Sequence, residues 1–441
     1  MAEPHRNRWL HYFAVLTALA TLGLVGMGGL VTSKGVGMAV PDWPTSYDYN
    51  MFALPISVWL TGGVFYEHTH RLWASIVGTL VVVLTRWLGG HKSRRPLAIV
   101  GVSETIVGFL LPLLGPDWKG AGYFLSGIGG VVILAAVVWV RNAPAPGSLP
   151  RLGWLAFALV QLQGLLGGLR VLLDAQVVAG ARLGTVFGIF HATLGQAFLV
   201  LLFVIALLTS RWWWKHRLPG RPAHGTNSGG LDSTIVAPIG SRLALAATLL
   251  ILFQLVLGAT MRHQHAGLAI PDFPLAYGRL WPDTSPEAVA IYNERRMDFT
   301  APNPITAFQI DLQMAHRLVA LTIAVLVGMV MLRSRRAFAK VASTDTSDHT
   351  PQALRRLSVF WFGLILVQIA LGAWTIWSNK AADIATMHVV VGALSLVTGT
   401  FWCLIAFRRF EPQWARAGAV SGSGLQIEPI FESNPATAVS K

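Results

Sequence analysis

The sequence predicts an all-α, polytopic membrane protein of about ten transmembrane helices, organised in two related halves. Hydrophobic residues make up 54% of the 441 positions and charged residues only 12%, whereas an average soluble protein has about 25% charged residues. Several apolar runs reach the roughly 18 residues that mark a transmembrane helix. Residues 37–44 and 267–274 also repeat one another at a constant offset of 230 positions.

The apolar runs are the predicted spans, and they are even in number. They fall at about 12–32, 64–88, 97–115, 121–141, 152–173, 185–209, 242–261, 307–332, 357–377 and 384–407. An even number places both termini on one side of the membrane. With the termini inside, the basic clusters beside the spans also lie inside, as the positive-inside rule requires. No Arg/Ser-rich transit segment precedes the first run, which favours a bacterial inner (plasma) membrane.

The excess of basic over acidic residues in the chain is explained by this topology. Lys and Arg number 34 against 20 Asp and Glu, and the excess lies in short clusters next to apolar runs. This placement is typical of membrane orientation and argues against a nucleic-acid partner. Cys403, within the last apolar run, is the single cysteine. An intrachain disulfide or a thiolate metal site is therefore impossible.

The repeats and the composition divide the chain into segments. Residues 1–209 form the first half, and residues 242–409 form the second half. Between them, 210–241 is Gly/Pro/Ser-rich and basic, which predicts a cytoplasmic linker. The tail 410–441 has no periodicity, and we expect it to be disordered. The span pair within 97–141 has no counterpart in the second half, so it is an insertion.

Two further motifs repeat between the halves, and one chemical difference separates them. Gln163-Gly164-Leu165-Leu166-Gly167 matches Gln368-Ile369-Ala370-Leu371-Gly372, and Glu67-His68-Thr69-His70-Arg71 matches Gln313-Met314-Ala315-His316-Arg317. His70 is the duplicated histidine, because Met314 stands where the first copy has His68. Glu67 becomes Gln313 in the second copy. We place the reaction at this difference, because an ionisable group inside a span predicts function.

Four histidines lie a short way into spans that run from outside to inside. Their common depth is roughly 6–14 Å below the outer boundary, at about 1.5 Å per residue. Each half supplies two, on different helices, which is the arrangement that holds a planar metal macrocycle from both faces. Arg71 and Arg317, next to two of them, could pair with haem propionates through bidentate hydrogen bonds. The predicted iron ligands are His70, His191, His316 and His388.

Other interpretations of these residues remain open. A histidine in a membrane can be a satisfied polar residue, and the arginines can be interfacial anchors. Structural zinc is disfavoured because there is no thiolate and carboxylates nearby are few. Transporters with duplicated halves carry ionisable groups near the midplane, whereas these histidines lie near one surface. We expect His263 to be solvated at a span end, His68 to be a polar group at the outer surface, and Glu104 to snorkel inward.

With these motifs, the chain resembles the haem A synthase family. The resemblance rests on Glu67-x-x-His70-Arg71, His191, Gln313-x-x-His316-Arg317 and His388, and it runs over residues 12–409 apart from the insertion. It implies two pseudo-symmetric four-helix bundles. The N-terminal bundle would hold haem O, the substrate, between His70 and His191. The C-terminal bundle would hold a permanent haem b between His316 and His388, with both haem sites towards the outer side.

The resemblance also implies an oxidoreductase. Its reaction would oxidise the ring methyl of haem O to a formyl group via hydroxylated intermediates, giving haem A for terminal oxidases. Glu67 would be the catalytic carboxylate. The implied partners are haem O, the enzyme that produces it, an unidentified electron acceptor and membrane lipid; the sequence leaves homo-oligomerisation open. Some family members carry cysteine pairs in the outer loops, which this chain lacks.

The alternative function is a di-haem electron-transfer protein, quinone-linked and similar to a cytochrome b. Two equivalent haem sites would suffice for electron transfer alone. The difference between Glu67 and Gln313 distinguishes the two hypotheses, because only an enzyme needs one reactive site.

Overall fold

The computed structural model describes residues 7–138, 143–215, 233–295, 304–341 and 350–409, and most of these residues are helical. Within them, nine continuous helical stretches are long and apolar enough to cross a membrane. One of these, Gly62–Leu114, contains two long helices, so each of the ten predicted spans corresponds to one long helix. The chain is therefore a multi-pass membrane protein. The long helices are α1 (Arg8–Ser33), α3 (Gly62–Gly89), α4 (Arg94–Leu110), α5 (Lys119–Val137), α6 (Leu149–Leu172), α7 (Leu183–Thr209), α9 (Ser233–His263), α11 (Ala307–Val341), α12 (Thr350–Trp377) and α13 (Ala382–Arg409).

Short elements connect the long helices. Strands β1 (Val177–Val178) and β2 (Ala181–Arg182) form an antiparallel pair between α6 and α7. The short helix α8 (Arg211–Lys215) and the first turns of α9 occupy the two ends of the predicted linker. Residues 216–232 and the predicted tail lie outside the described residues. The other short elements are η1 (Met51–Ala53), α2 (Ile56–Trp59), η2 (Gly90–Ser93), η3 (Leu111–Leu114), η4 (Pro116–Trp118), η5 (Ala266–Leu268) and α10 (Pro286–Glu294).

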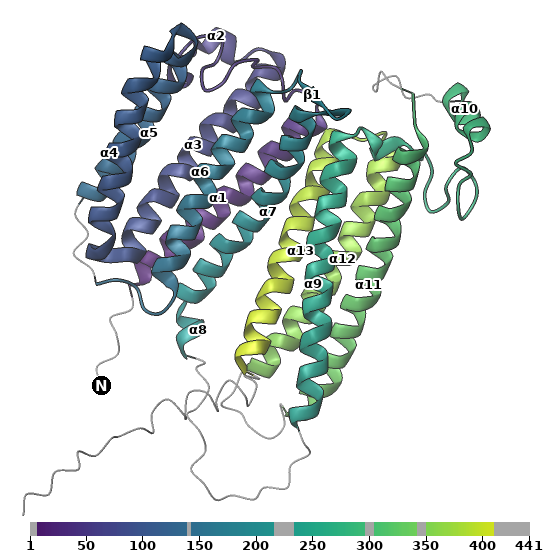
Figure 1. Cartoon of the computed structure of the whole chain (residues 1–441). Helices are drawn as coiled ribbons and strands as arrows, with labels where there is room; N and C mark the ends of the chain where they lie inside the picture. The colour runs from purple at the N-terminus through teal and green to yellow at the C-terminus, as the bar shows by residue number, and fades with distance from the viewer. Residues whose placement is uncertain (1–6, 139–142, 216–232, 296–303, 342–349, 410–441) are drawn as a thin grey trace, which may run out of the picture.

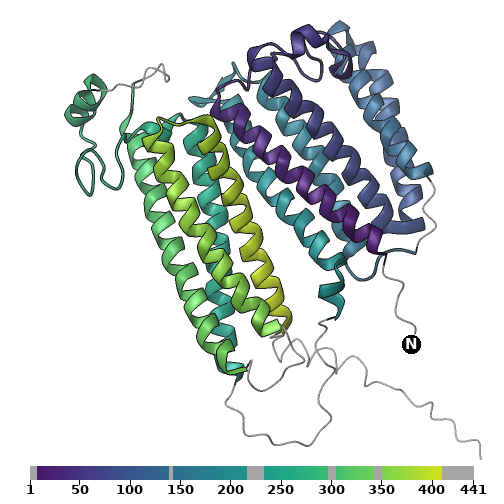
Figure 2. The ribbon, with the colours of Figure 1, turned by 180° about the vertical axis from the view of Figure 1, so that it is seen from behind.

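The long helices close two rings. In the first ring, α1 and α6 each pack against α3 and α7; in the second, α9 and α12 each pack against α11 and α13 (Figure 1, Figure 2). Each ring encloses its own apolar core, for example around Leu202 in the first and Trp361 in the second. The start of α1 and the end of α13 lie at the same end of the molecule, and the long loops lie at the opposite end.

The inserted helices α4 and α5 pack closely against each other and lie beside α3. Their contact depends on small residues, since a Cβ on Gly101 or Gly108 would run into the backbone of α5. Such close backbone approach is a common way for helices to associate in membranes. The pair thus forms a rigid hairpin on the outside of the first ring.

The two rings meet through α1 and α7 on one side and α9 and α13 on the other. Gly26 and Gly29 of α1 face Val390 and Thr386 of α13, where an added Cβ would lie 3.5 and 3.4 Å from their side chains. Arg262, near the end of α9, donates hydrogen bonds of 2.6 Å to the carbonyl oxygen of Gly29 and to Ser33 Oγ. The junction is therefore both closely packed and charged.

The two repeated loops fold in the same way. Asp42 accepts hydrogen bonds from the backbone N–H groups of Tyr47 and Asp48 at 2.7 and 3.0 Å. Asp272 accepts the corresponding bonds from Tyr277 and Gly278 at 2.7 and 2.8 Å. Both tyrosine hydroxyls donate to the carbonyl oxygen three residues before the aspartate. The sequence repeat is thus a repeated loop structure, at the end of the molecule opposite the start of α1 (Figure 1).

Candidate haem site

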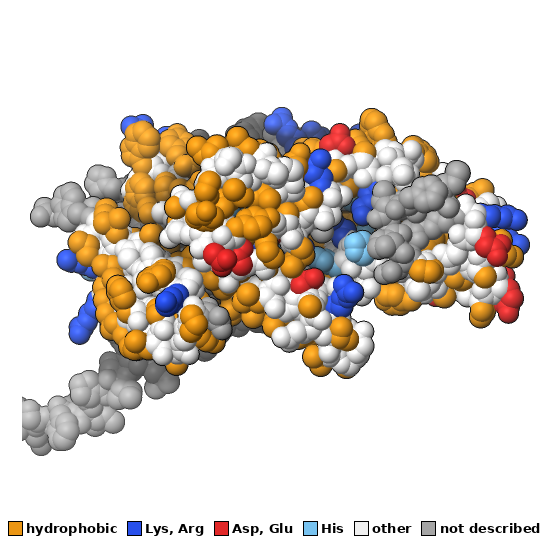
Figure 3. All heavy atoms as spheres, turned by 90° about the horizontal axis from the view of Figure 1, so that it is seen from above, with side chains coloured by type: hydrophobic (Ala, Val, Ile, Leu, Met, Phe, Trp, Pro, Cys, Tyr) orange, Lys and Arg blue, Asp and Glu red, His pale blue; other side chains and the backbone are white. Residues whose placement is uncertain are grey.

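A single cavity of about 1830 Å³ contains the four predicted ligands. His70 comes from α3, His191 from α7, His316 from α11 and His388 from α13. Each of the four imidazole rings is half-buried, because one side of it faces the cavity. Figure 3 shows the molecule from the end that is at the top of Figure 1. Histidine atoms are visible there in a hollow near the middle, with Lys or Arg side chains beside them. The helices therefore bring together the four side chains that the sequence analysis selected.

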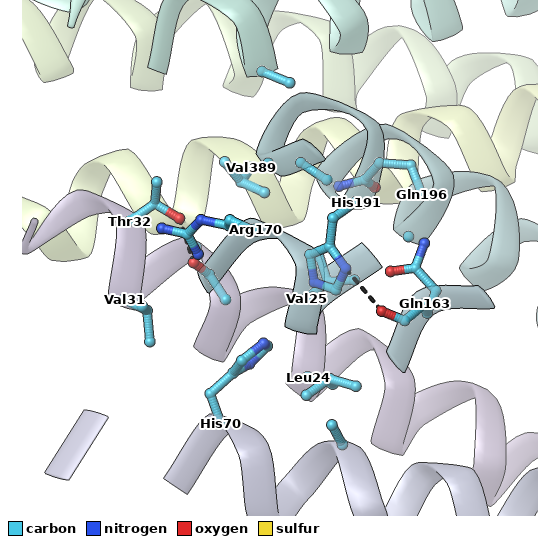
Figure 4. A pocket seen from close by; sticks show the side chains of 18 of the residues that line it. Leu24, Val25, Val31, Thr32, His70, Gln163, Arg170, His191, Gln196 and Val389 are labelled. Carbon is cyan, nitrogen blue, oxygen red and sulfur yellow. Dashed lines mark hydrogen bonds between the residues drawn. The ribbon is translucent and has the colours of Figure 1, made fainter. Parts of the chain in front are cut away.

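The first pair lies inside the first ring. His70 and His191 point towards one another across the cavity (Figure 4). His191 Nδ1 is 3.2 Å from the backbone carbonyl oxygen of Gln163. Donation from Nδ1 to this oxygen leaves Nε2 as the free, unprotonated nitrogen, which is the usual arrangement of a metal-binding imidazole.

The second pair has the separation that shared coordination requires. The ring centroids of His316 and His388 are 6.4 Å apart, and the ring planes are inclined by 50°. Two metal–imidazole bonds of about 2 Å each, together with the half-widths of the two rings, account for this separation. A single iron between the rings therefore fits this pair.

A glycine on a neighbouring helix supports each of the four imidazoles. A Cβ on Gly28, Gly167, Gly258 or Gly372 would lie 3.1, 3.3, 3.4 or 3.1 Å from Cε1 of His70, His191, His316 or His388, respectively. Contacts this short leave little space for a larger residue, so the glycines fix the depth of each ring. The same contact occurs in both halves, which is consistent with one duplicated design.

These residues fit a haem in each half. The cavity wall is mainly apolar, as a porphyrin requires, and each half supplies two opposed imidazoles. In the described part of the protein, the Nδ1 atoms of His70, His316 and His388 have no hydrogen-bond partner. Among the described residues, no group of three or more His, Cys, Asp or Glu side chains is placed to hold a metal ion.

Glu67 is buried at the cavity wall and holds the first repeated loop. Its Oε2 atom accepts a hydrogen bond of 2.9 Å from the backbone N–H of Val40, and its Oε1 atom forms a salt bridge of 2.8 Å with Arg71. Gln313 occupies the matching position and accepts a hydrogen bond of 2.8 Å from the N–H of Ile270. The two side chains share the loop contact, and the negative charge is specific to Glu67.

Arg71 and Arg317 both donate hydrogen bonds to carbonyl oxygens of the repeated loops, which the sequence did not predict. Arg71 donates to the carbonyl oxygens of Asp42, Thr45 and Val40 as well as to Glu67, over distances of 2.6 to 3.0 Å. Arg317 donates to the carbonyl oxygens of Leu275 and Asp272 at 2.8 and 2.7 Å. Both side chains still line the cavity, but a propionate would have to use the few donors left.

Two arginines outside the repeated motifs also line the cavity. Arg170 of α6 lies beside His70 and His191 (Figure 4). Arg262 of α9 lines the same cavity. Neither is part of a repeated motif, since Thr375 and Thr32 occupy the matching positions. Arg170 carried a signal in the sequence, because it is a charge inside the predicted span 152–173, whereas Arg262 lies just beyond the predicted span 242–261.

Three polar residues differ in position from what the sequence suggested. His68 is fully buried rather than at the surface, and its Nδ1 is 3.1 Å from Ser46 Oγ. His263 is half-buried and contacts Gly188 of α7, where an added Cβ would meet its ring. Glu104 accepts a hydrogen bond of 2.5 Å from Gln161 Nε2 of α6, instead of pointing to the inner surface. Contacts with the first loop decide the position of His68, and contacts with other helices decide those of His263 and Glu104; a single span reveals neither kind of contact.

Comparison with known proteins gives two matches. A family model described as a cytochrome oxidase assembly protein, COX15-CtaA, matches residues 124–400. The matched region contains His191, His316 and His388, and it begins after Glu67 and His70. The chain is also 29% identical over 184 residues to the "Heme A synthase" of Shewanella oneidensis, which is 42% of this chain and 48% of that protein. The chain thus spans about half the length of the curated relative it matches.

Proposed function

Since this chain belongs to the COX15-CtaA family of cytochrome oxidase assembly proteins, we propose that it is a haem A synthase. The reaction is the oxidation of the ring methyl of haem O to a formyl group via hydroxylated intermediates. The single observation that carries the proposal is the pair of opposed imidazoles in each half, with an ionisable carboxylate beside only one pair. The described relative, a haem A synthase, supports the same reaction.

In this proposal, the first half is the reactive one. His70 and His191 hold haem O, and Arg170 offers a positive charge to a propionate at the same level. Converting the methyl group to a formyl group adds one oxygen atom, which water can supply, and releases four protons and four electrons, the electrons going to the acceptor. Positive charge develops at the methyl carbon as the electrons leave. Glu67, buried next to this pocket, can accept a proton or stabilise that charge. Arg71 keeps the carboxylate oriented through the salt bridge of 2.8 Å.

The second half is proposed to hold a permanent haem b between His316 and His388. When bound, this group supplies reversible one-electron chemistry that can pass electrons to an acceptor. Gln313 lacks an ionisable proton, which agrees with a site that does not carry out the oxidation. The enzyme that produces haem O and the electron acceptor are the proposed partners.

The proposed location is a bacterial inner membrane, with the termini in the cytoplasm and the haem sites towards the outer side. The basic clusters support this orientation by the positive-inside rule. The start of α1 and the end of α13 lie at the end of the molecule opposite the two repeated loops, which is consistent with this orientation (Figure 1).

A di-haem electron-transfer protein is the second candidate, and the matching geometry of the two histidine pairs favours it. One experiment separates the candidates. Membranes containing the protein and a source of haem O are extracted with acidic acetone, and the haems are separated by chromatography. We expect haem A or hydroxylated haem O in the extract. Haem b with unchanged haem O would contradict the enzyme and support electron transfer.

A further inference from the structure

The cavity has a side arm that the reaction described above does not use. It runs between α3, α5 and α6, on the side of the first histidine pair where the inserted hairpin packs. Three glycines from three different helices line it: Gly78 of α3, Gly127 of α5 and Gly164 of α6. At each of them an added Cβ would have no atom within 4 Å. These glycines therefore border open space, unlike those that support the imidazoles.

Helix geometry explains why the space opens here. Near the inner end, α3 and α6 are in close contact, because Thr85 Oγ1 donates a hydrogen bond of 2.9 Å to the carbonyl oxygen of Gly153. Gly78 lies two turns from Thr85 on the same face, and Gly164 lies three turns from Gly153 on the facing side. At these two positions neither helix carries a side chain on this face, and an added Cβ would meet no atom within 4 Å. The seam between α3 and α6 therefore widens towards the haem pocket.

Helix α5 of the inserted hairpin forms the remaining wall. Phe124, Ile128 and Val131 line the cavity from this helix, and they cover about 10 Å of helix length. The hairpin is tied to α6 by the hydrogen bond between Glu104 and Gln161. Opposite α5, Val82, Val160 and Leu165 also line the cavity. The arm is thus a mainly apolar slot, with Gln161 of α6 also at its wall.

The outer end of the slot is closed. The ring of Trp43 meets Phe124 edge-on with 5.6 Å between centroids, and a Cβ on Gly168 would run into the Trp43 ring. A phospholipid with its headgroup at the outer surface would have to displace this aromatic lid. A chain attached to a ring already held between His70 and His191 starts inside the cavity instead. A chain that is part of the bound substrate is therefore favoured over a phospholipid as the occupant of the slot.

We propose that this arm binds the long isoprenoid chain of haem O, and that the inserted hairpin makes the first pocket selective for a haem carrying that chain. The proposal rests on the proposed function for the identity of the substrate. Haem b has the same iron and propionates but only a short vinyl group at the corresponding ring position. Burial of an apolar chain in an apolar slot stabilises its complex in proportion to the area buried. The arm therefore distinguishes the substrate from the resident haem.

The test fills the arm without disturbing the protein. Gly164→Leu and Gly127→Leu each place a side chain in the open space. Gly130→Leu, also on α5, is the matched control, because an added Cβ there also meets no atom within 4 Å and Gly130 does not line the cavity. Purified protein, with its second site filled by haem b, is titrated separately with haem O and with haem b. The change in the haem absorption spectrum gives the two dissociation constants of the first site.

We expect the unaltered protein and Gly130→Leu to bind haem O more tightly than haem b. In the two arm variants, haem O binding should weaken by about tenfold or more, since several buried methylene groups are lost, while haem b binding stays the same. Unchanged haem O binding, or equal weakening for both haems, would overturn the proposal. A co-purified phospholipid that Gly164→Leu removes, with no effect on haem O, would identify a lipid site instead.

The two proposals can fail separately. If the unaltered protein prefers haem O but produces no hydroxylated haem or haem A, the proposed reaction is wrong, while binding of the isoprenoid chain in the arm is still supported. If it does produce them, and the arm variants bind haem O as tightly as the control, the proposed reaction is supported and binding of the isoprenoid chain in the arm is wrong.

Discussion

At the scale of single residues, the pair Glu67 and Gln313 is the most informative comparison in the chain. Both are buried, and both accept a hydrogen bond from a loop N–H, at 2.9 and 2.8 Å. Gln313 therefore shows that an amide can perform the structural task of this position. What remains specific to Glu67 is a charge and an exchangeable proton at the wall of the cavity.

This comparison predicts that Glu67→Gln leaves the fold and the haem content intact but stops the conversion of haem O. The rate should fall by about 10²–10⁴-fold, the usual contribution of a positioned acid or base. The measurement is the yield of hydroxylated haem and haem A, set against haem content in the purified variant. Gln313→Glu is the matched variant and should not alter the yield. Conversion at the normal rate in Glu67→Gln would contradict the catalytic role.

At the scale of elements, the two repeated loops position the upper wall of the cavity. Asp42 organises the first loop through its bonds to Tyr47 and Asp48. Burial raises the pKa of Asp42, but the hydrogen bonds from Thr45, Asp48 and Tyr47 outweigh burial and hold the pKa below its ordinary value of 3.8. The charged form is therefore the one that the folded loop prefers.

This preference sets the pH dependence of the loop. A carboxyl group with a lowered pKa in the folded state stabilises the fold above its ordinary pKa, and that contribution is lost as the pH falls through the folded value. We expect Asp42→Asn to lower the thermal midpoint at neutral pH, by a free energy of about 1–2 kcal/mol, and to weaken the acid dependence. Asp48→Asn, an exposed residue of the same loop, is the control. Equal midpoints for both variants would show that Asp42 does not order the loop.

The elements also show what sequence alone can predict. The ten spans followed from apolar length, and the four histidines followed from the repeat, because both signals lie along the chain. Arg170 and Arg262 were missed because their partners lie on other helices and their counterparts are threonines. The hydrogen bonds of Arg71 to three loop carbonyls were likewise hidden, since loop folding brings those oxygens to the span.

At the scale of the whole molecule, the two rings are one unit with a common interior. The cavity reaches all four imidazoles, and the junction is closed by the glycines of α1 and by Arg262. A partly buried arginine between helices is stabilised where its N–H donors find acceptors. The carbonyl oxygen of Gly29 and the hydroxyl of Ser33 accept from Nη2 of Arg262 here.

We therefore expect Arg262→Gln to loosen the contact between the rings. The loss of two charge-assisted hydrogen bonds should lower the free energy of unfolding by about 1–3 kcal/mol, seen as a lower thermal midpoint in detergent. Arg279→Gln, in an exposed part of the second loop, should leave the midpoint unchanged. If the two variants melt alike, the junction does not depend on Arg262.

The common interior has a consequence for biogenesis. Under the proposed function, the common cavity would receive both haems, so a newly made chain must bind two porphyrins in one interior. The order of binding then matters, because haem O bound first between His316 and His388 would block the permanent haem b. The separation of 6.4 Å between these two rings already fits an iron, which favours early loading of the second site.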